Sequence, residues 1–229
     1  MVKYSSGDVL LGGLPLGGVG SGGVELDNRG RLVNARFANN WGFPIRELRG
    51  FHVFVKPKNS PGFFMQSTVN VIGFEGRGVV LDFEGRWPFA WLRASRNGVD
   101  VEVEAFTPII PGNIKDSSLP AVGFTVKVKG SDALVVVSVP NVVGSNPIGR
   151  INRSINGGVL FTNTKAPDND PAKGNMTLIT SKPKFTITQY NINAKPEHAL
   201  KARTWKGAFE NPEPWVTIDA GGMPRDEEP

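Results

Sequence analysis

The chain has no cysteine among its 229 residues. Disulfides, thiolate nucleophiles and cysteine-ligated zinc are therefore excluded. Histidine is almost as scarce, because His52 and His198 are the only two and cannot form a three-histidine zinc site. Secreted proteins of this size often carry a disulfide, so we expect a cytoplasmic location. No residue pattern suggests a metal ligand set or a cofactor, and we expect neither.

Long apolar runs are also missing. No stretch approaches the roughly 18 apolar residues of a transmembrane helix, and Val9–Leu11 is too short for the apolar region of a signal peptide. The formal net charge is +5 and the pI is about 9.6, but Lys and Arg are scattered along the chain and form no basic arm. We therefore expect no transmembrane segment and no nucleic-acid partner.

Helical periodicity is nearly absent, and period-two alternation recurs in its place. The clearest run is 99–106, which places Val99, Val101, Val103 and Ala105 on one face of a strand. Weaker alternation covers 51–55, 124–129 and 185–188, and the run 134–139 is continuously apolar, as in a strand buried on both faces. One short helix is plausible, around residues 196–203.

Glycine and proline are abundant, with 28 and 18 residues, which suits many strands joined by tight turns. Asn97-Gly98 is a hairpin signal between two strand-like runs. The sequence therefore predicts an all-β, mostly antiparallel, two-sheet sandwich of supersandwich-like type with at most one or two short helices. We assign residues 1–220 to this sandwich and residues 221–229 to a linker or disordered tail.

Three patterns that could carry chemistry have simpler explanations. The run 18–23 matches the G-x-G-x-x-G nucleotide pattern, but a strand and a turn follow it where a helix would be needed. The carboxylates of Asp100, Glu102 and Glu104 share the outer face of a strand and are more simply explained by solvation. The run 168–170 resembles the start of a calcium loop but lacks the glycine and late glutamate that such a loop needs.

Five tryptophans could stack on sugar rings, although large aromatic side chains more often belong to the core. They are Trp41, Trp87, Trp91, Trp205 and Trp215.

Two segments together resemble a known family. The first is the glycine-rich run Gly13–Gly22, which includes Pro-Leu-Gly-Gly-Val-Gly and is followed by Asn39-Asn40-Trp41. The second is the run 106–111, Phe-Thr-Pro-Ile-Ile-Pro, followed by 116–120, Asp-Ser-Ser-Leu-Pro. Both are similar to the N-terminal domain of glycoside hydrolase family 116, which includes non-lysosomal glucosylceramidases (bile-acid β-glucosidases) and archaeal β-glucosidases and β-xylosidases. The likeness is closest over residues 8–140.

The resemblance implies an enzyme with a β-sandwich followed by an (α/α)6 helical barrel that holds a Glu nucleophile and an Asp acid/base. A retaining mechanism needs two carboxyl groups about 5 Å apart. The sequence shows no run of amphipathic helices before Pro229, so it offers no counterpart of the catalytic motifs. We assign no catalytic residue and expect the chain alone to be inactive. A fragment, a split gene and a stand-alone sandwich are all consistent with this pattern.

The leading hypothesis is a non-catalytic domain that covers one side of the barrel, in the same or a separate chain, and meets a β-glycoside substrate only through the full enzyme. The expected interface or substrate-mouth residues are Gly17, Gly18, Gly20, Gly22, Asn40 and Trp41. The alternatives are a stand-alone carbohydrate-binding module with an exposed tryptophan, and a self-sufficient hydrolase, which would lack its carboxylate pair. An exposed apolar patch beside the glycine loop would favour the first hypothesis, and a lone exposed tryptophan in a groove the second.

Overall fold

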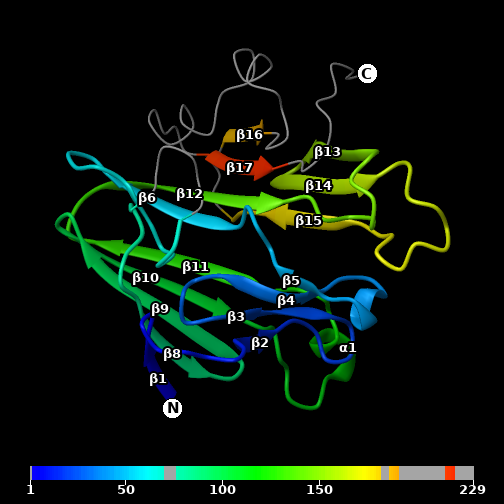
Figure 1. Cartoon of the computed structure of the whole chain (residues 1–229), viewed down its shortest axis with the longest axis horizontal. Helices are drawn as coiled ribbons and strands as arrows, with labels where there is room; N and C mark the ends of the chain where they lie inside the picture. The colour runs from blue at the N-terminus through cyan, green and yellow to red at the C-terminus, as the bar shows by residue number, and fades with distance from the viewer. Residues whose placement is uncertain (1, 70–75, 182–185, 191–214, 220–229) are drawn as a thin grey trace. The chain divides into compact units, whose positions relative to one another are not determined.

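The computed structural model describes residues 2–69, 76–181, 186–190 and 215–219, and strands dominate this part of the chain (Figure 1). The helical elements are the 3-10 helix η1 (Asn40–Gly42) and the single-turn helix α1 (Ile114–Ser117). The strands are β1 (Val2–Ser5), β2 (Leu14–Leu16), β3 (Gly23–Leu26), β4 (Leu32–Arg36), β5 (Ile45–Glu47), β6 (His52–Pro57), β7 (Phe63–Phe64), β8 (Asp82–Arg86), β9 (Phe89–Arg96), β10 (Val99–Phe106), β11 (Gly123–Lys129), β12 (Ala133–Pro140), β13 (Arg150–Ile155), β14 (Gly158–Asn163), β15 (Met176–Ile179), β16 (Thr186–Tyr190) and β17 (Trp215–Asp219).

The predicted all-β, mostly antiparallel sandwich class is confirmed, with the strands shared among four sheets of the described chain where the sequence suggested two. Only the pairings of β17 with β12 and β16 are parallel among those the structure describes. The expected helix around 196–203 lies outside the described residues, as does the expected tail at 221–229. Within the described ranges, no helix combines the length and apolar character needed to cross a bilayer.

The chain divides into two compact units, Met1–Val135 and Val136–Pro229. The assignment of 1–220 to a single sandwich domain stays a prediction. The first unit holds an antiparallel sheet in the order β1-β8-β9-β10-β11 and a second in the order β2-β3-β4-β5. These two sheets are in contact near Leu14, whose side chain reaches within 3.4 Å of the position that a Cβ on Gly85 would occupy. The two sheets of the first unit therefore pack against each other at this point, as in a sandwich.

The central strand β10 shows why the sequence pattern was informative. Val99, Val101, Val103 and Ala105 are all buried on one face, as alternation predicts. Asn97 and Gly98, which join β9 to β10, both have positive φ, at 54° and 78°. Two successive residues with positive φ match the right-handed twist of a tight hairpin, so the predicted Asn-Gly turn is confirmed.

Other strands depart from simple alternation. In β6, Val53, Phe54 and Val55 are consecutive and all buried, so both faces of this strand are covered. In β11, Phe124 lies opposite the buried Ala105, and its ring centroid is 5.6 Å from that of the buried Phe51, so it shares the inward face. It is nevertheless 37% exposed, because β11 ends the order of its sheet and has a partner strand on one side only. Strand β12, expected to be buried on both faces, is fully buried on one, where Val136 and Ser138 lie, and half-buried on the other.

The second unit contains an antiparallel sheet in the order β13-β14-β15. Its buried core cluster consists of Val143, Val159 and Phe161, and partly buried apolar side chains from β12 and β15 pack against it. The loop 168–170 is an ordinary hydrogen-bonded surface loop. Asp170 accepts hydrogen bonds from Ser145 and from the Ala172 N–H group, and Asp168 pairs with Lys173.

His52 in β6 behaves as the structural histidine that its strand position suggests. Its ring packs edge-on against Phe64, with the ring centroids 5.5 Å apart. Burial lowers the pKa of His52 from 6.5 to about 4, and its hydrogen bond with Gln66 opposes this shift only in part. The folded chain therefore holds His52 neutral at pH values where an unfolded chain would protonate it.

This pKa difference predicts an acid-sensitive stability. Between pH 6.5 and 4 the unfolded state binds a proton that the folded state excludes, so the free energy of unfolding falls as the pH is lowered, by on the order of 3 kcal/mol over the full range. Replacing His52 with Asn should remove most of this dependence. Urea unfolding midpoints at pH 7 and pH 4.5 measure it, with His198→Asn as the matched control. An unchanged pH dependence in His52→Asn would contradict the argument.

Candidate functional site

The glycine loop, residues 17–22 between β2 and β3, is hydrogen-bonded to a segment that lies about a hundred positions later in the sequence. The Val19 N–H group donates to the Ser117 carbonyl oxygen over 2.9 Å. The Gly17 N–H group donates to Thr107 Oγ1 over 2.8 Å. Thr107 and Ser117 belong to the second of the two sequence blocks that resemble family 116, so the fold brings the two blocks together.

The four glycines that the sequence assigned to the interface have different surroundings. A Cβ on Gly18 would collide with the carbonyl oxygen of Leu119 and lie 2.6 Å from that of Ser118. Gly17 and Gly22 have φ values of 130° and 98° and lie against the backbone of the loop itself and of β4. Gly20 also has a positive φ, 74°, but a Cβ there would meet nothing within 4 Å. Three of the glycines therefore serve internal packing, and Gly20 is the one that faces open space.

Asn40 and Trp41, the remaining predicted residues, also differ. Asn40 is buried, and its Oδ1 accepts the Phe37 N–H over 2.7 Å, so it fixes the chain leaving β4. Trp41 and the nearby Phe43 are 78% and 87% exposed. η1 therefore presents aromatic rings outward while Asn40 holds its backbone.

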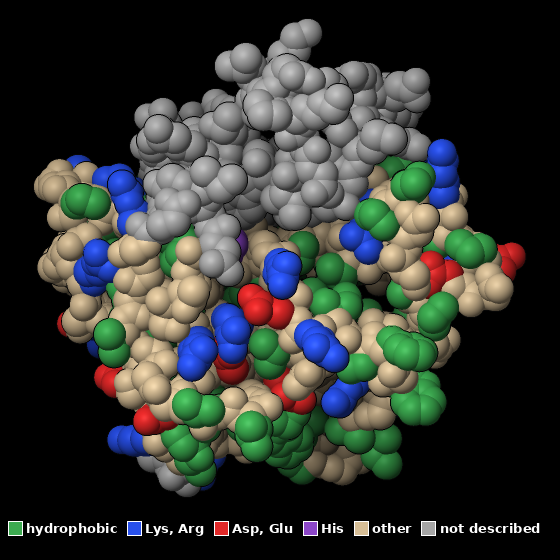
Figure 2. Space-filling view, viewed as in Figure 1, with side chains coloured by type: hydrophobic (Ala, Val, Ile, Leu, Met, Phe, Trp, Pro, Cys, Tyr) green, Lys and Arg blue, Asp and Glu red, His purple; other side chains and the backbone are tan. Residues whose placement is uncertain are grey.

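Exposed apolar side chains lie on both segments of this contact: Val19 in the glycine loop, and Ile110, Ile114 and Leu119 in and beside α1. We group them with the exposed Trp41 and Phe43 of the η1 segment under the name apolar end surface. The Val19–Ser117 hydrogen bond links the glycine loop to α1. In the view of Figure 1 α1 lies at the lower right, and Figure 2 shows hydrophobic side chains at the same side of the molecule. Exposed apolar side chains beside the glycine loop are the feature that favours the docking hypothesis.

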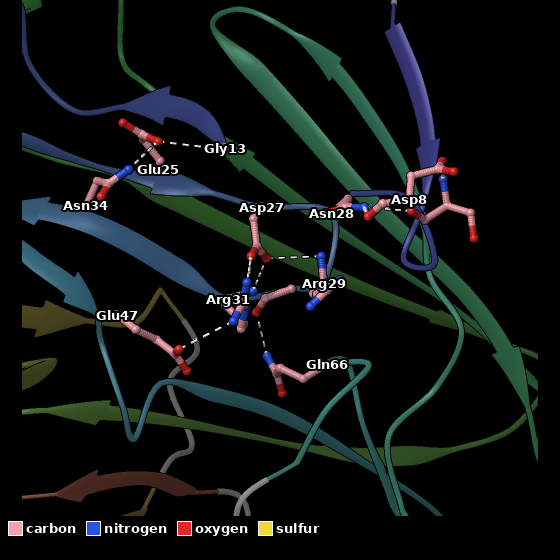
Figure 3. A network of polar contacts seen from close by, with 12 residues as sticks. Asp8, Gly13, Glu25, Asp27, Asn28, Arg29, Arg31, Asn34, Glu47 and Gln66 are labelled. Atoms are coloured by element: carbon pink, nitrogen blue, oxygen red, sulfur yellow. Dashed lines mark hydrogen bonds and ion pairs between the residues drawn. The ribbon is translucent and has the colours of Figure 1, made fainter. Parts of the chain in front are cut away.

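A separate hollow of about 480 Å³ opens on the sheet β2-β3-β4-β5. Acidic and basic side chains gather over these strands in the space-filling view (Figure 2), and Figure 3 shows the polar contacts beneath them. The lining residues are Leu10, Leu11, Gly12, Asp27, Arg31, Val33, Asn34, Arg46, Glu47 and Arg49.

Arg31 is the arginine of the hollow whose guanidinium is held by ion pairs. Its guanidinium lies 2.7 Å from Asp27 Oδ2 and 3.4 Å from Glu47 Oε2. Asp27 is buried, and its other oxygen accepts the N–H groups of Arg29 and Arg31 (Figure 3). The carboxylate of Asp27 therefore holds both a turn and a guanidinium in place.

A β-bulge directs two neighbouring side chains into this hollow. The pairing of β3 with β4 shifts between Gly23 and Glu25, and Asn34 at the shift has φ 50°. In a regular strand successive side chains alternate between faces, but a bulge interrupts that alternation. Val33 and Asn34 can therefore both line the hollow. Asn34 Nδ2 donates to Glu25 Oε2 over 2.9 Å, and the Gly13 N–H donates to the same oxygen over 3.0 Å.

Sequence reasoning missed the arginine-lined hollow. Arg46 and Arg49 lie in and just after a three-residue strand, too short to show a period, and Arg31 is 15 positions earlier. The one usable signal was the turn-like run 27–30, which does not reveal that the carboxylate of Asp27 also anchors a guanidinium.

The outward carboxylates of β10 form an ion-pair ladder. Glu102 lies 2.8 Å from Arg93 and 3.0 Å from Lys127. The hydrogen bonds from Lys127 and then Arg93 lower the pKa of Glu102. Glu104 accepts the Trp91 indole N–H over 2.9 Å. This arrangement keeps Glu102 ionised, whereas a general acid needs a raised pKa.

The different surroundings of Gly18 and Gly20 predict different costs of substitution. Gly18→Ala would push a Cβ into two carbonyl groups and should lower the free energy of unfolding by about 2 kcal/mol or more. Gly20→Ala has open space and should cost only about 1 kcal/mol, because its positive φ disfavours a side chain. Chemical denaturation of the two variants measures the difference. Equal losses would show that the loop is not packed against residues 118–119.

Comparison with known sequences agrees with this geometry. The family described as "beta-glucosidase 2, glycosyl-hydrolase family 116 N-term" matches residues 13–223, most of the chain and both sequence blocks. No curated protein matches the chain with significance. On the extent of the family match, the chain belongs to the glycosyl hydrolase family 116 N-terminal domain family.

Proposed function

We propose that this chain is the non-catalytic N-terminal domain of a β-glucosidase- or glucosylceramidase-type glycoside hydrolase, and that its apolar end surface docks on an (α/α)6 catalytic domain. The observation that carries the proposal is that exposed apolar side chains lie on both segments of the contact between the two family-like blocks. The catalytic domain can belong to the same polypeptide or to a separate chain. On the sequence argument alone, we keep the cytoplasm as the proposed compartment.

The physical argument is the cost of leaving apolar surface in water. Ile114, at 79% exposed, begins the single turn of α1, Leu119 follows that turn, and Val19 lies in the loop bonded to it. Clusters of this kind beside rigid backbone are typical of interaction sites, because covering them removes apolar area from water. Gly20 lets the loop lie flat beside them, since it adds no side chain to hold a partner away.

The described carboxylates support a non-catalytic role. Glu84 and Glu102 both contact Arg93, and Asp27 contacts Arg31. Of these groups, Glu102 has its pKa lowered by the hydrogen bonds from Lys127 and then Arg93, which favours its ionised form. A retaining glycosidase needs one carboxyl group that stays protonated to donate to the leaving oxygen. The proposal therefore assigns both catalytic carboxyl groups to the partner domain.

The carbohydrate-binding alternative rests on exposed tryptophans. Trp41 and Trp87 are both more than half exposed. The hollow, however, is lined by neither of them, and Trp41 is two positions from Phe43, which is also largely exposed. The docking proposal accounts for Trp41 and Phe43 together, whereas a sugar platform needs only one ring.

The docking proposal predicts a selective loss of association. Ile114→Lys places a charge in the centre of the surface and should weaken binding to a family 116 catalytic domain by about tenfold or more. Because the side chain is already exposed, the thermal midpoint of the isolated chain should change by about 2 °C or less. Isothermal titration calorimetry and thermal unfolding measure the two effects.

Val80→Lys is the matched control, since Val80 is 76% exposed in the same unit but lies outside the apolar end surface. An equal loss of association in both variants would show that the added positive charge, and not the position of Ile114, weakens binding. Retained association in Ile114→Lys would contradict docking through this surface. Binding of a soluble β-glucan that Trp41→Ala abolishes would support the carbohydrate-binding alternative instead.

The proposed role also predicts that the purified chain does not cleave aryl β-glucosides, because the proposal assigns the acid and the nucleophile to the catalytic domain and Glu102 on β10 is held ionised by Lys127 and Arg93. Activity should appear only when a family 116 catalytic domain is added. Release of the aryl group, followed by absorbance, measures this. Hydrolysis by the chain alone that disappears in Glu102→Gln would place the active site on β10 and overturn the assignment.

A further inference from the structure

We propose that the arginine-lined hollow on the sheet β2-β3-β4-β5 is a binding site for an oxyanion, a phosphate or carboxylate group, held between the guanidinium groups of Arg46 and Arg49. This inference rests on the hollow itself and does not depend on docking of a catalytic domain. The hollow lies within the first unit, and its volume of about 480 Å³ is within the range of small-ligand sites.

The charges of the hollow are unequally matched. Three arginines and two carboxylates line it, which leaves one excess positive charge. Both carboxylates, those of Asp27 and Glu47, already contact Arg31. Across the described residues, the guanidinium groups of Arg46 and Arg49 have no ion pair or hydrogen bond. The two unmatched cations are therefore available to a ligand.

The walls of the hollow are fixed by contacts that do not involve these two arginines. The strip Leu10–Gly12 is held at both ends, because Asn28 Nδ2 donates to the Asp8 carbonyl oxygen and the Gly13 N–H donates to Glu25 (Figure 3). Glu25 also accepts from Asn34, the bulged residue that lines the hollow. A site whose walls are already positioned loses less conformational entropy when a ligand binds.

The chemistry of the free groups selects the ligand class. A guanidinium presents planar donors that match two oxygens of a carboxylate or phosphate, and it stays charged at all physiological pH values. Leu10 and Leu11 add apolar surface beside these donors. A neutral sugar would leave the charges of Arg46 and Arg49 unmatched, whereas an anion on a body of monosaccharide size would match the charges and fill the space.

The test uses the whole chain and defined probes. Inorganic phosphate, glucose 6-phosphate and glucose are titrated by isothermal calorimetry at low salt. We expect both phosphates to bind and glucose not to bind. Arg46→Gln and Arg49→Gln should each weaken phosphate binding by about tenfold, because each removes a charge-assisted contact. Arg46 lies in β5 and Arg49 in the turn after it, so the test still holds if one of the two variants fails to fold.

Arg86→Gln is the charge-matched control, since Arg86 lies on β8, outside the hollow, and should bind phosphate as the parent does. Tighter binding of glucose 6-phosphate than of phosphate would identify an anionic sugar as the ligand, and equal binding would identify free phosphate. No binding of either phosphate, or an equal loss in Arg86→Gln, would overturn the proposal.

Discussion

The fold of the first unit depends on one close backbone approach, the contact of the glycine loop with residues 117–119. The hydrogen bond from Val19 to Ser117 joins chain segments about a hundred residues apart. It forms because Gly18 has no side chain to separate the two backbones. The link positions α1 beside the loop, and with it the exposed apolar side chains that the proposed docking requires. Closing so long a loop costs entropy, so the contacts around it must be well packed to persist.

Residue patterns predicted the structure correctly where one local effect decides it, such as the burial of one strand face or a turn that needs positive φ. The valines of β10 alternate because one face of that strand is buried, and Asn97-Gly98 forms its turn because both residues accept positive φ. The family-like blocks also identified a real contact, although sequence alone could not show that they touch. Patterns failed where neighbours decide the outcome. Phe124 has an inward position in the alternation, but β11 is the last strand of its sheet, and only the sheet order reveals this.

The candidate site was predictable only in part, for a related reason. The glycine run could be recognised as a place of close backbone approach, and Trp41 was recognised as a possible surface aromatic. Tertiary contacts, which no local pattern encodes, decide that Asn40 is buried. They also decide that Gly18 packs against other backbone while Gly20 faces open space. The joint presence of Val33 and Asn34 in the arginine-lined hollow depends on a register shift between β3 and β4. A shift of one residue leaves almost no trace in composition or periodicity, yet it decides which face a side chain occupies.

The bulge at Asn34 has a consequence for how the lining of the hollow can change between related domains. Two consecutive side chains, Val33 and Asn34, line the hollow because one extra residue interrupts the alternation of β4. Deleting that residue would restore the regular pairing of β4 with β3 and withdraw one of the two side chains from the hollow, but it would shift the pairing of β4 with β5. Homologous domains could therefore gain or lose this surface by insertion or deletion of a single codon, with every lining arginine unchanged. Alignments that penalise gaps inside strands would hide such an event.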